Sequence, residues 1–427
     1  MKVVFIEPRA SEANVYRKLH MPLLGPIYLA TILRQRGHEV VVYNEDIYQP
    51  EYSRIQADVV GISILTSTAK RGYAIAKRFP KDKVIIGGVH ASLLPEEALH
   101  YCRQVVVGEA EEVIAEVVEG LRQEPIVQGR AIKNLDTLPF PDFSLLKGYR
   151  PGSFILPVST SRGCPFDCTF CSVTKVFGRE YRFRSPENVV EELKSHKAKA
   201  VFFCDDNFAA FPKRTSSLLK LMKKETYFNW ACQVRCDVVQ DKELLTMMRQ
   251  AGCRVVCIGL ESVNPKTLEA YNKRQTLEDI VRAIKIFHRN RIKIHGMFVV
   301  GSDDDSEATV SDTLEFALRH KIDTFQMSIL TPFPGTRVYS DLQSQGRIFS
   351  YDWDLYDGQH IVFTPRRLTA RQLQLAVIQA YSRFYSLARF VLLVIRFHLR
   401  NAVFRLMGYT IVKKWLRQNR SLSWLNA

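Results

Sequence analysis

Three cysteines in one short stretch are the residues whose types and spacing most clearly indicate chemistry. Cys164, Cys168 and Cys171 form a Cys-x₃-Cys-x₂-Cys array, introduced by Arg162-Gly163 and followed by a basic, aromatic run to Arg184. Thiolates this close in sequence can turn toward a common point, as an iron–sulfur cluster requires. Three ligands leave one iron of a four-iron cluster open, and an open position distinguishes catalytic from structural metal sites. The pattern favours an iron–sulfur site over a zinc site completed by a distant ligand, or three ordinary thiols.

Polar side chains also follow successive predicted strands around this array. The strands are predicted at residues 154–159, 200–204, 229–234, 254–260, 293–300 and 323–330, with helices at 186–195, 214–224, 242–250, 277–290 and 308–319. This alternation predicts a partial (β/α)₆ barrel over residues 153–365, with its chemistry at the carboxyl ends of the strands. The cysteine loop follows the first strand, and Asp205-Asp206, Arg235 and Glu261 follow the next three. Any one of these could be an ordinary helix cap, but four consecutive strand ends predict a shared site.

Residues 1–130 show a second α/β pattern. Strands are predicted at 2–6, 39–43, 59–65, 83–86 and 104–107, with helical segments such as 25–36 and 110–122 between them. The pattern predicts a doubly wound parallel sheet, in which ligands bind beyond the carboxyl ends of the strands. The candidate binding residues lie at those ends: Ser63, Leu65, Thr66, Gly87, Gly88, His90, Gly108 and Glu109. Paired glycines allow a backbone to approach a ligand closely. Residues 131–152, rich in Pro and Gly, predict a linker.

The cysteine loop and the strand-end residues resemble those of the radical SAM superfamily, whose signature has an aromatic residue where Phe170 stands. The resemblance implies a [4Fe–4S] cluster on the three cysteines, whose open iron chelates S-adenosylmethionine. Reduction by a donor such as flavodoxin or ferredoxin would then cleave S-adenosylmethionine to a 5′-deoxyadenosyl radical. It also implies that Asp205-Asp206 contacts the amino group of this cofactor and Arg235 its carboxylate. Glu261 would accept from the ribose hydroxyls or the amino group, and Phe170 would pack beside the adenine.

The first 130 residues resemble the cobalamin-binding domain found in one large subfamily of these enzymes. The family's Ser-x-Leu and Gly-Gly elements match Ser63-Ile-Leu65 and Gly87-Gly88. The Asp-x-His-x-x-Gly motif, which supplies a lower cobalt ligand elsewhere, is absent, and Glu7-Pro-Arg-Ala stands near its place. Cobalt ligation therefore stays open. His90 could contact the nucleotide tail or the corrin edge, or be a loop histidine bonded to backbone. A degenerate domain without cofactor is the alternative.

The resemblance implies an enzyme, first of all a cobalamin-dependent radical SAM methyltransferase acting on an unactivated carbon of an apolar or lipid-like small molecule. One alternative is a radical SAM cyclase of the magnesium-protoporphyrin type. Another is an RNA-modifying methylthiotransferase, but that family has three further N-terminal cysteines, whereas Cys102 is the only cysteine here before Cys164. A non-catalytic iron–sulfur or zinc module would not need Asp205, Arg235 and Glu261 at successive strand ends. No side chain stands out as a catalytic acid or base.

Bulk properties agree with a globular protein of a reducing compartment. The 427 residues are 46% hydrophobic and 24% charged, and nine cysteines, three of them clustered, fit a metal cluster better than a disulfide scaffold. The first residues lead directly into a predicted strand, without the apolar segment of a signal peptide. No apolar run is long enough to span a bilayer. These features predict a cytoplasmic protein.

The C-terminal region, residues 366–427, carries most of the excess of positive charge. The net charge is +16, and no acidic residue follows Asp357. A helix is predicted at 373–388, and the apolar run 390–395 is interrupted by Arg396 and Arg400. The pattern predicts a basic amphipathic region that lies on the inner surface of the membrane. The alternatives are a helix packed on the barrel, or nucleic-acid binding, for which the aliphatic density is higher than phosphate contact needs.

Overall fold

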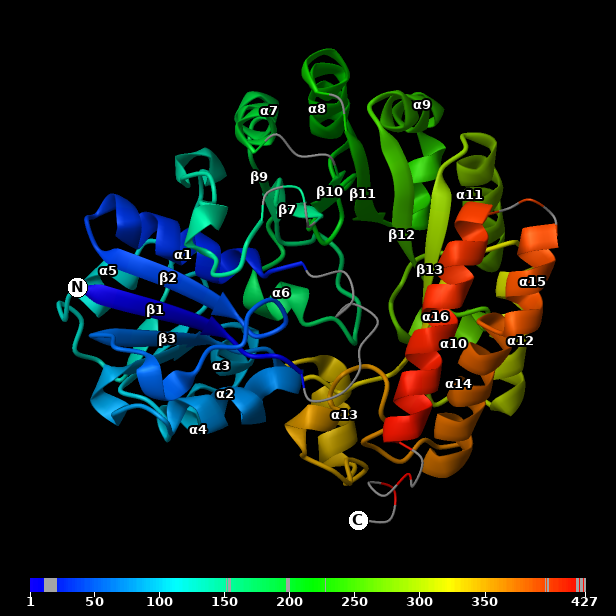
Figure 1. Ribbon diagram of the computed structural model, residues 1–427. Coiled ribbons are helices and arrows are strands. Elements are labelled where there is room, and N and C mark those ends of the chain that lie inside the picture. The colour runs from blue at the N-terminus through cyan, green and yellow to red at the C-terminus, as the bar shows by residue number, and fades with distance from the viewer. Residues whose placement is uncertain are drawn as a thin grey trace. The chain divides into compact units, whose positions relative to one another are not determined.

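The computed structural model describes residues 1–10, 21–150, 152, 155–196, 200–226, 228–395, 397, 399–419, 422 and 425 (Figure 1). The chain divides into two compact units. The first consists of Met1–Ser11, Tyr16–Pro165 and Ser172–Cys204, and the second of Glu12–Val15, Phe166–Cys171 and Asp205–Ala427.

The first sheet has six parallel strands in the order β2-β1-β3-β4-β5-β6. They are β1 Lys2–Glu7, β2 Glu39–Asn44, β3 Val59–Ser63, β4 Val84–Gly87, β5 Gln104–Val107 and β6 Ile126–Gln128. The helices of this region are α1 Leu24–Gln35, α2 Ala69–Ala76, α3 Val89–Leu93, α4 Pro95–Leu99 and α5 Ile114–Val118. Strand order reverses between β1 and β3, and ligands of such sheets bind in the crevice outside that point. The predicted doubly wound sheet is confirmed.

Two predictions for this region differ from the structure. The short strand β6 was not expected, and the helix predicted at 110–122 is reduced to Ile114–Val118. Gly120 adopts a left-handed conformation (φ 75°) just after this helix, which a helix cannot continue through. The predicted linker packs on the first sheet: Leu145 and Leu146 belong to its core, and the Lys147 amide donates to the Val42 carbonyl (2.9 Å).

The second sheet has six strands in the order β14-β13-β12-β11-β10-β7. They are β7 Leu156–Val158, β10 Ala200–Phe203, β11 Asn229–Val234, β12 Cys253–Glu261, β13 Lys293–Val300 and β14 Thr324–Ile329. The helices between them are α7 Pro186–Ser195, α8 Pro212–Glu225, α9 Lys242–Gln250, α10 Pro265–Ala270, α11 Leu277–Arg289 and α12 Glu307–Arg319. Neighbours along the chain are neighbours in the sheet, as in a partial (β/α)₆ barrel. Residue 154 of the first predicted strand lies outside the described residues.

Local sequence explains why these helices begin where they do. Thr276 and Asp279 form a reciprocal capping box at the start of α11, and Ser306 caps α12 in the same way. On α11 the apolar positions recur at helical spacing and are buried on one face: Ile280, Ala283, Ile284 and Phe287.

The C-terminal region is helical, as predicted, but the helix predicted at 373–388 ends at Phe384. The chain forms α14 Ala370–Phe384, α15 Leu387–Ile395 and α16 Leu399–Gln418. The break follows from Tyr385, whose hydroxyl accepts from the Phe325 amide (2.8 Å) and donates to the Phe325 carbonyl (2.7 Å). The Tyr381 hydroxyl likewise accepts from the Met327 amide (2.9 Å). These bonds attach α14 to β14, the edge strand of the sheet, and cover that edge.

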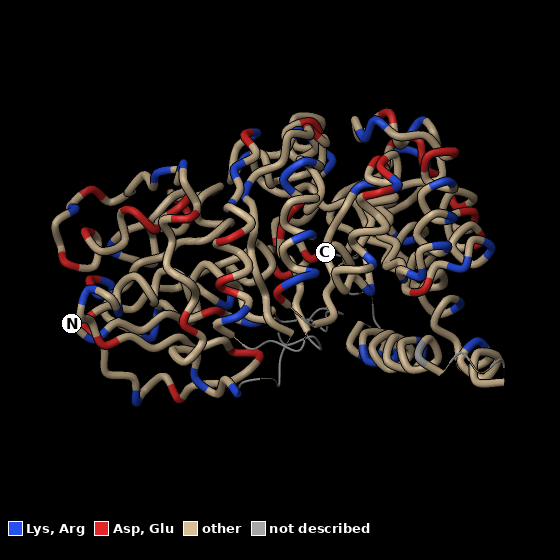
Figure 2. Tube along the Cα trace, turned by 90° about the horizontal axis from the view of Figure 1, so that it is seen from above, with Lys and Arg blue, Asp and Glu red and all other residues tan. Residues whose placement is uncertain are grey.

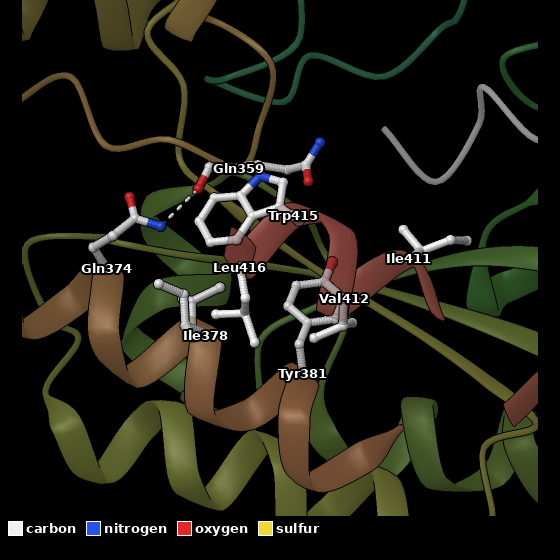
Figure 3. A pocket seen from close by; sticks show the side chains of 9 residues that line it. Gln359, Gln374, Ile378, Tyr381, Ile411, Val412, Trp415 and Leu416 are labelled. Carbon is white, nitrogen blue, oxygen red and sulfur yellow. Dashed lines mark hydrogen bonds between the residues drawn. The ribbon is translucent and has the colours of Figure 1, made fainter. Parts of the chain in front are cut away.

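Helix α16 packs on the same region. The buried Arg405 guanidinium lies 3.4 Å from the Phe384 ring centre and donates to the Phe384 carbonyl (2.7 Å). Asn401 donates to Asp323 (3.0 Å). Figure 3 shows Tyr381 of α14 facing Trp415 of α16 across a pocket. Its free volume of about 30 Å³ holds about one water molecule, so we interpret it as a packing void.

Candidate functional site

The segment Phe166–Cys171 is held in the second unit by the loop that follows α10. The Thr169 amide donates to the Tyr271 carbonyl (3.2 Å), and the Asn272 side chain donates to the Asp167 carbonyl (2.9 Å). The Phe170 ring meets the Tyr271 ring edge-on, with centroids 5.0 Å apart. These contacts fix a segment in which Cys168 and Cys171 are half-buried, as suits thiolates that bind a metal cluster near the surface.

A buried ion pair lies at the carboxyl end of β12. Lys273 Nζ is 2.6 Å from Glu261 Oε1, and both side chains are 8% exposed. Glu261 has a left-handed backbone (φ 62°), which non-glycine residues adopt only where the surroundings enforce it. Gly259 makes room for the pair, because a Cβ there would lie 2.3 Å from Glu261 Oε1 and 2.7 Å from Lys273 Nζ. Sequence reasoning identified Glu261 but missed Lys273.

Lys273 also connects this pair to the cysteine loop. Burial by itself would lower the pKa of Lys273, but the charges of Glu261 and of the Cys168 thiolate raise it overall. The lysine is therefore an ammonium group beside one of the predicted cluster ligands. A buried cation in this position would stabilise an anionic thiolate cluster. The residue types thus suit an iron–sulfur cluster, but the described residues gather no three Cys, His, Asp or Glu side chains into a metal site, so ligation by Cys164, Cys168 and Cys171 stays a prediction.

Arg235, at the end of β11, joins the same group of residues. Its guanidinium carbon lies 3.7 Å from the Phe166 ring centre, and its Nη2 donates to the Lys273 carbonyl (2.7 Å). Its Nε is 3.3 Å from Asp237 Oδ2. The side chain is nearly buried. The structure therefore brings Arg235, Glu261 and the segment of Cys168 together around Lys273, while a contact of Arg235 with a carboxylate of S-adenosylmethionine stays a prediction.

The two aspartates after β10 differ in environment. Asp205 is buried, whereas Asp206 is exposed to solvent at the next position. Protein atoms nevertheless surround Asp206, and desolvation together with repulsion by Asp205 raises its pKa to about 7. Asp206 is thus the more exposed member of the pair, and a nearby ammonium group would favour its ionised form; contact of either aspartate with S-adenosylmethionine stays a prediction.

The glycine pair lies at the end of β4, and its two members have different roles. Gly88 is left-handed (φ 95°), and a Cβ there would lie 2.7 Å from the Ile64 carbonyl oxygen and 3.0 Å from Ser63 Oγ. A Cβ on Gly87 would find its nearest neighbour at 3.5 Å. Gly88 is therefore required by the chain itself, and only Gly87 leaves space for a ligand. Ser63 and Leu65 are half-buried beside it, and Thr66 is buried.

The remaining predicted cobalamin contacts face protein partners. His90 is fully buried, with Nε2 3.3 Å from Glu97 Oε1, an arrangement that favours the structural alternative for this histidine. The Gly108 amide donates to the Ser92 hydroxyl (2.9 Å). Glu109 is buried and binds Arg162 and Arg182. A role of these residues toward cobalamin stays a prediction.

Glu7 ends β1 at the reversal point of the sheet. Its two carboxylate oxygens accept from the Leu23 amide (3.3 and 3.2 Å). Desolvation, reinforced by the nearby Asp46, raises its pKa to about 7, although hydrogen bonds oppose the shift. Half-exposed groups at the ends of β3 and β4 and a titratable carboxyl at the end of β1 thus lie at the carboxyl ends of the strands, where this fold binds ligands.

Comparison with known proteins covers both units. The Radical SAM superfamily matches residues 158–317, and the B12 binding domain matches residues 14–118. Bacteriochlorophyllide d C-12(1)-methyltransferase of Chlorobaculum tepidum is 33% identical over 331 residues, 74% of this chain and 72% of that enzyme. The anaerobic magnesium-protoporphyrin IX monomethyl ester cyclase of Rubrivivax gelatinosus is 26% identical over 90% of this chain and 77% of its own length.

A solved structure shows the same fold. The radical S-adenosylmethionine methyltransferase TsrM from Kitasatospora setae, with cobalamin and a [4Fe–4S] cluster bound, superposes with a TM-score of 0.66. The superposition covers 81% of this chain and 75% of that chain, at 16% sequence identity. The predicted combination of a cobalamin-binding sheet with a partial radical SAM barrel is confirmed.

Proposed function

Because the chain belongs to the radical SAM enzymes that carry a cobalamin-binding domain, we propose that it methylates an unactivated carbon of an apolar, lipid-like small molecule. Its cofactors are a [4Fe–4S] cluster, S-adenosylmethionine and cobalamin. The observation that carries the proposal is the 33% identity to a methyltransferase over most of both chains. Cyclisation is the second candidate, supported by the cyclase relative at 26% identity.

The residues fit these cofactors. When bound, they supply hydrogen abstraction by a radical and a transferable methyl group. In the proposed site Cys164, Cys168 and Cys171 hold the cluster, and Lys273 neutralises part of its negative charge. Asp206 offers a carboxylate to an ammonium group of the cofactor. Each of these side chains binds or orients a cofactor. The protein contributes to the rate by placing the reacting carbons.

The test uses S-adenosylmethionine with a deuterated methyl group. Anaerobic enzyme, reductant, hydroxocobalamin and a lipid extract of the source cells should yield a product that carries the labelled methyl group. Replacement of all three cysteines by alanine should abolish both the cluster and the formation of 5′-deoxyadenosine. A product that loses hydrogen without gaining label would establish the cyclase instead. Retention of cluster absorbance by the triple variant would place the metal elsewhere.

A surface on α15 and the start of α16 supports an apolar substrate delivered from a membrane. None of the described side chains of α15 is buried. Large apolar side chains are exposed one after another along this surface, with Ile395 at 67% and Phe397 at 88%, and the others are Val391, Leu392, Leu399 and Val403. Apolar patches of this extent mark interaction sites. Among the described residues no helix has the length and apolar character that crossing a bilayer requires.

The charge of these two helices favours an anionic membrane as the partner. Arg389 lies on α15 with the apolar residues, Lys413, Lys414 and Arg417 lie toward the end of α16, and the sequence has no acidic residue after Asp357. Figure 2 marks Lys and Arg in blue and Asp and Glu in red along the chain. Each basic group near an anionic leaflet contributes about 1 kcal/mol, so a few suffice for reversible attachment. We therefore propose that this surface rests on the inner leaflet of the membrane.

Substitution within the surface is a cleaner test than truncation, because deletion of α16 would also remove Arg405 from its contact with Phe384. Wild type should float with anionic vesicles and not with neutral ones, and a variant with Val391, Ile395 and Phe397 all changed to Ser should not float. The control changes two exposed apolar residues elsewhere, Leu121 (69%) and Phe211 (46%), to Ser. Equal flotation of the surface variant would refute attachment through this surface.

A further inference from the structure

Two arginines flank the cysteine loop and meet at one carboxylate. The strands β8 Ser161–Arg162 and β9 Arg182–Phe183 form a small antiparallel pair in which Arg162 lies directly opposite Arg182. Arg162 Nη1 donates to Glu109 Oε2 (2.7 Å), and Arg182 Nη1 donates to the same oxygen (3.1 Å). Arg182 Nη2 binds Glu109 Oε1. Glu109 therefore holds both strands of the pair at once.

The electrostatics require such a carboxylate. Like charges directly opposite each other destabilise a pair of strands, and these two guanidinium groups are only 12% and 4% exposed. Glu109 receives both, and Glu111 accepts a further bond from Arg162. Burial by itself would raise the pKa of Glu109, but the two arginines lower it overall, so the group is ionised. Without Glu109, two nearly buried cations would face each other.

The strand pair is the stem of the cysteine loop. Cys164 follows Arg162 by two residues. Between them Gly163 is left-handed (φ 84°), and a Cβ there would lie 2.3 Å from the Glu180 carbonyl oxygen, on the returning arm of the loop. Arg182 also donates to the carbonyls of Ile132 (2.7 Å) and Phe177 (3.3 Å). The two arms of the loop are thus packed together where they leave the strand pair.

We infer that Glu109 is a positioning residue, which anchors the stem of the cysteine loop to the carboxyl end of β5 in the cobalamin-type sheet. Glu109 follows Gly108, whose amide binds Ser92 of α3, and α3 begins directly after Gly88. The carboxyl end of the sheet therefore carries both the glycine pair that follows β4 and the residue that anchors the cysteine loop. Placement of reacting groups within a fraction of an ångström strongly affects rate. The inference rests on the cofactors of the family and is independent of which product forms.

The test compares Glu109→Gln with wild type, both loaded with cluster and cobalamin. Glu109→Gln should bind iron in the wild-type amount, and cobalamin is added to saturation so that any change in its affinity does not affect the comparison. Amide exchange in residues 161–184 should rise about tenfold, equivalent to about 1.4 kcal/mol, while exchange in the strands β1, β3 and β4 stays unchanged. The electron paramagnetic resonance spectrum of the reduced cluster should become more heterogeneous. That signature reports the geometry of the cluster in the cysteine loop, which a general loss of stability would not change selectively.

Two further variants keep the test decisive. Glu119→Gln is the matched control, because Glu119 pairs with Arg36 (3.0 Å) in the same unit but away from the loop. Glu109→Gln combined with Arg182→Gln removes one cation together with the carboxylate and leaves Arg162 to Glu111, so this variant should fold even where the single variant does not. It should still show faster exchange in residues 161–184. Amide exchange and spectra equal to those of the Glu119→Gln variant would overturn the inference. If wild type binds no cobalamin, the cofactor-free proteins are compared by amide exchange alone.

Discussion

Replacement of Lys273 by Met tests the buried ion pair on which the proposed cluster environment depends. Lys273 Nζ lies 2.6 Å from Glu261 Oε1, and each side chain is 8% exposed. Met has a similar length but no charge, so Glu261 keeps its buried position and loses its cation. Removal of one partner from a buried pair costs about 3–5 kcal/mol. The Arg235 side chain donates to the backbone carbonyl of residue 273, which the substitution leaves in place, so this bond should survive.

The loss arises because a buried carboxylate that loses its cationic partner opposes folding. Urea unfolding of cofactor-free protein, followed by tryptophan fluorescence, measures the difference in the free energy of unfolding from wild type.

Two controls separate the pair from other effects of the substitution. The double variant Glu261→Gln with Lys273→Met has neither charge and should recover most of the stability, since neutral replacement of a buried pair is often tolerated. Arg282→Met breaks the exposed pair with Asp279 on α11 and should cost less than about 1 kcal/mol. A deficit of Lys273→Met as small as this would refute the reasoning.

Three further results are expected. Gly88→Ala should lower the free energy of unfolding by about 1–3 kcal/mol, because residue 88 has a positive φ and lies close to the Ile64 backbone. Gly87→Val should unfold like wild type but bind cobalamin more weakly in a spectral titration. Burial raises the pKa of Glu7 to about 7. Its contribution to stability is therefore present below its usual pKa and is lost as pH rises through 7, a fall of up to about 3 kcal/mol in the free energy of unfolding. Glu7→Gln should remove this fall when unfolding is measured as a function of pH. With its pKa raised to about 7 by desolvation and Asp205, Asp206 should favour S-adenosylmethionine binding as pH rises through 7, and Asp206→Asn should abolish that dependence in equilibrium binding.

Regular elements of this chain could be predicted from sequence because their signals are local. The strands β5, β11 and β13 and the helices α7 and α9 have the bounds that the hydrophobic period and the caps predict. Each of these segments carries its own periodicity, start and stop signals. The cofactor class was also accessible, since the cysteine spacing and the strand-end residues stand within short stretches.

Element ends that depend on distant partners could not be predicted. The apolar pattern continues through residues 384–388, yet the chain breaks there because the Tyr385 hydroxyl binds the backbone of Phe325 on β14. The sequence of α16 predicts a helix that lies on a membrane, but in the structure its Arg405 is buried against Phe384. The periodicity of a segment shows which of its faces is apolar, but only the tertiary structure decides what that face packs against.

The candidate site also has a part that the sequence predicts and a part that only the tertiary structure shows. Sequence alone determined the thiolates and the acidic and basic groups after successive strands, because parallel strands bring their carboxyl ends to one edge of a sheet. Only the tertiary structure revealed Lys273 beside Glu261, the dependence of Gly88 on the Ile64 backbone, and the two arginines that meet at Glu109. Charges separated by tens of residues leave no periodic signal, since their pairing depends on how distant segments pack and on the need to compensate each buried charge.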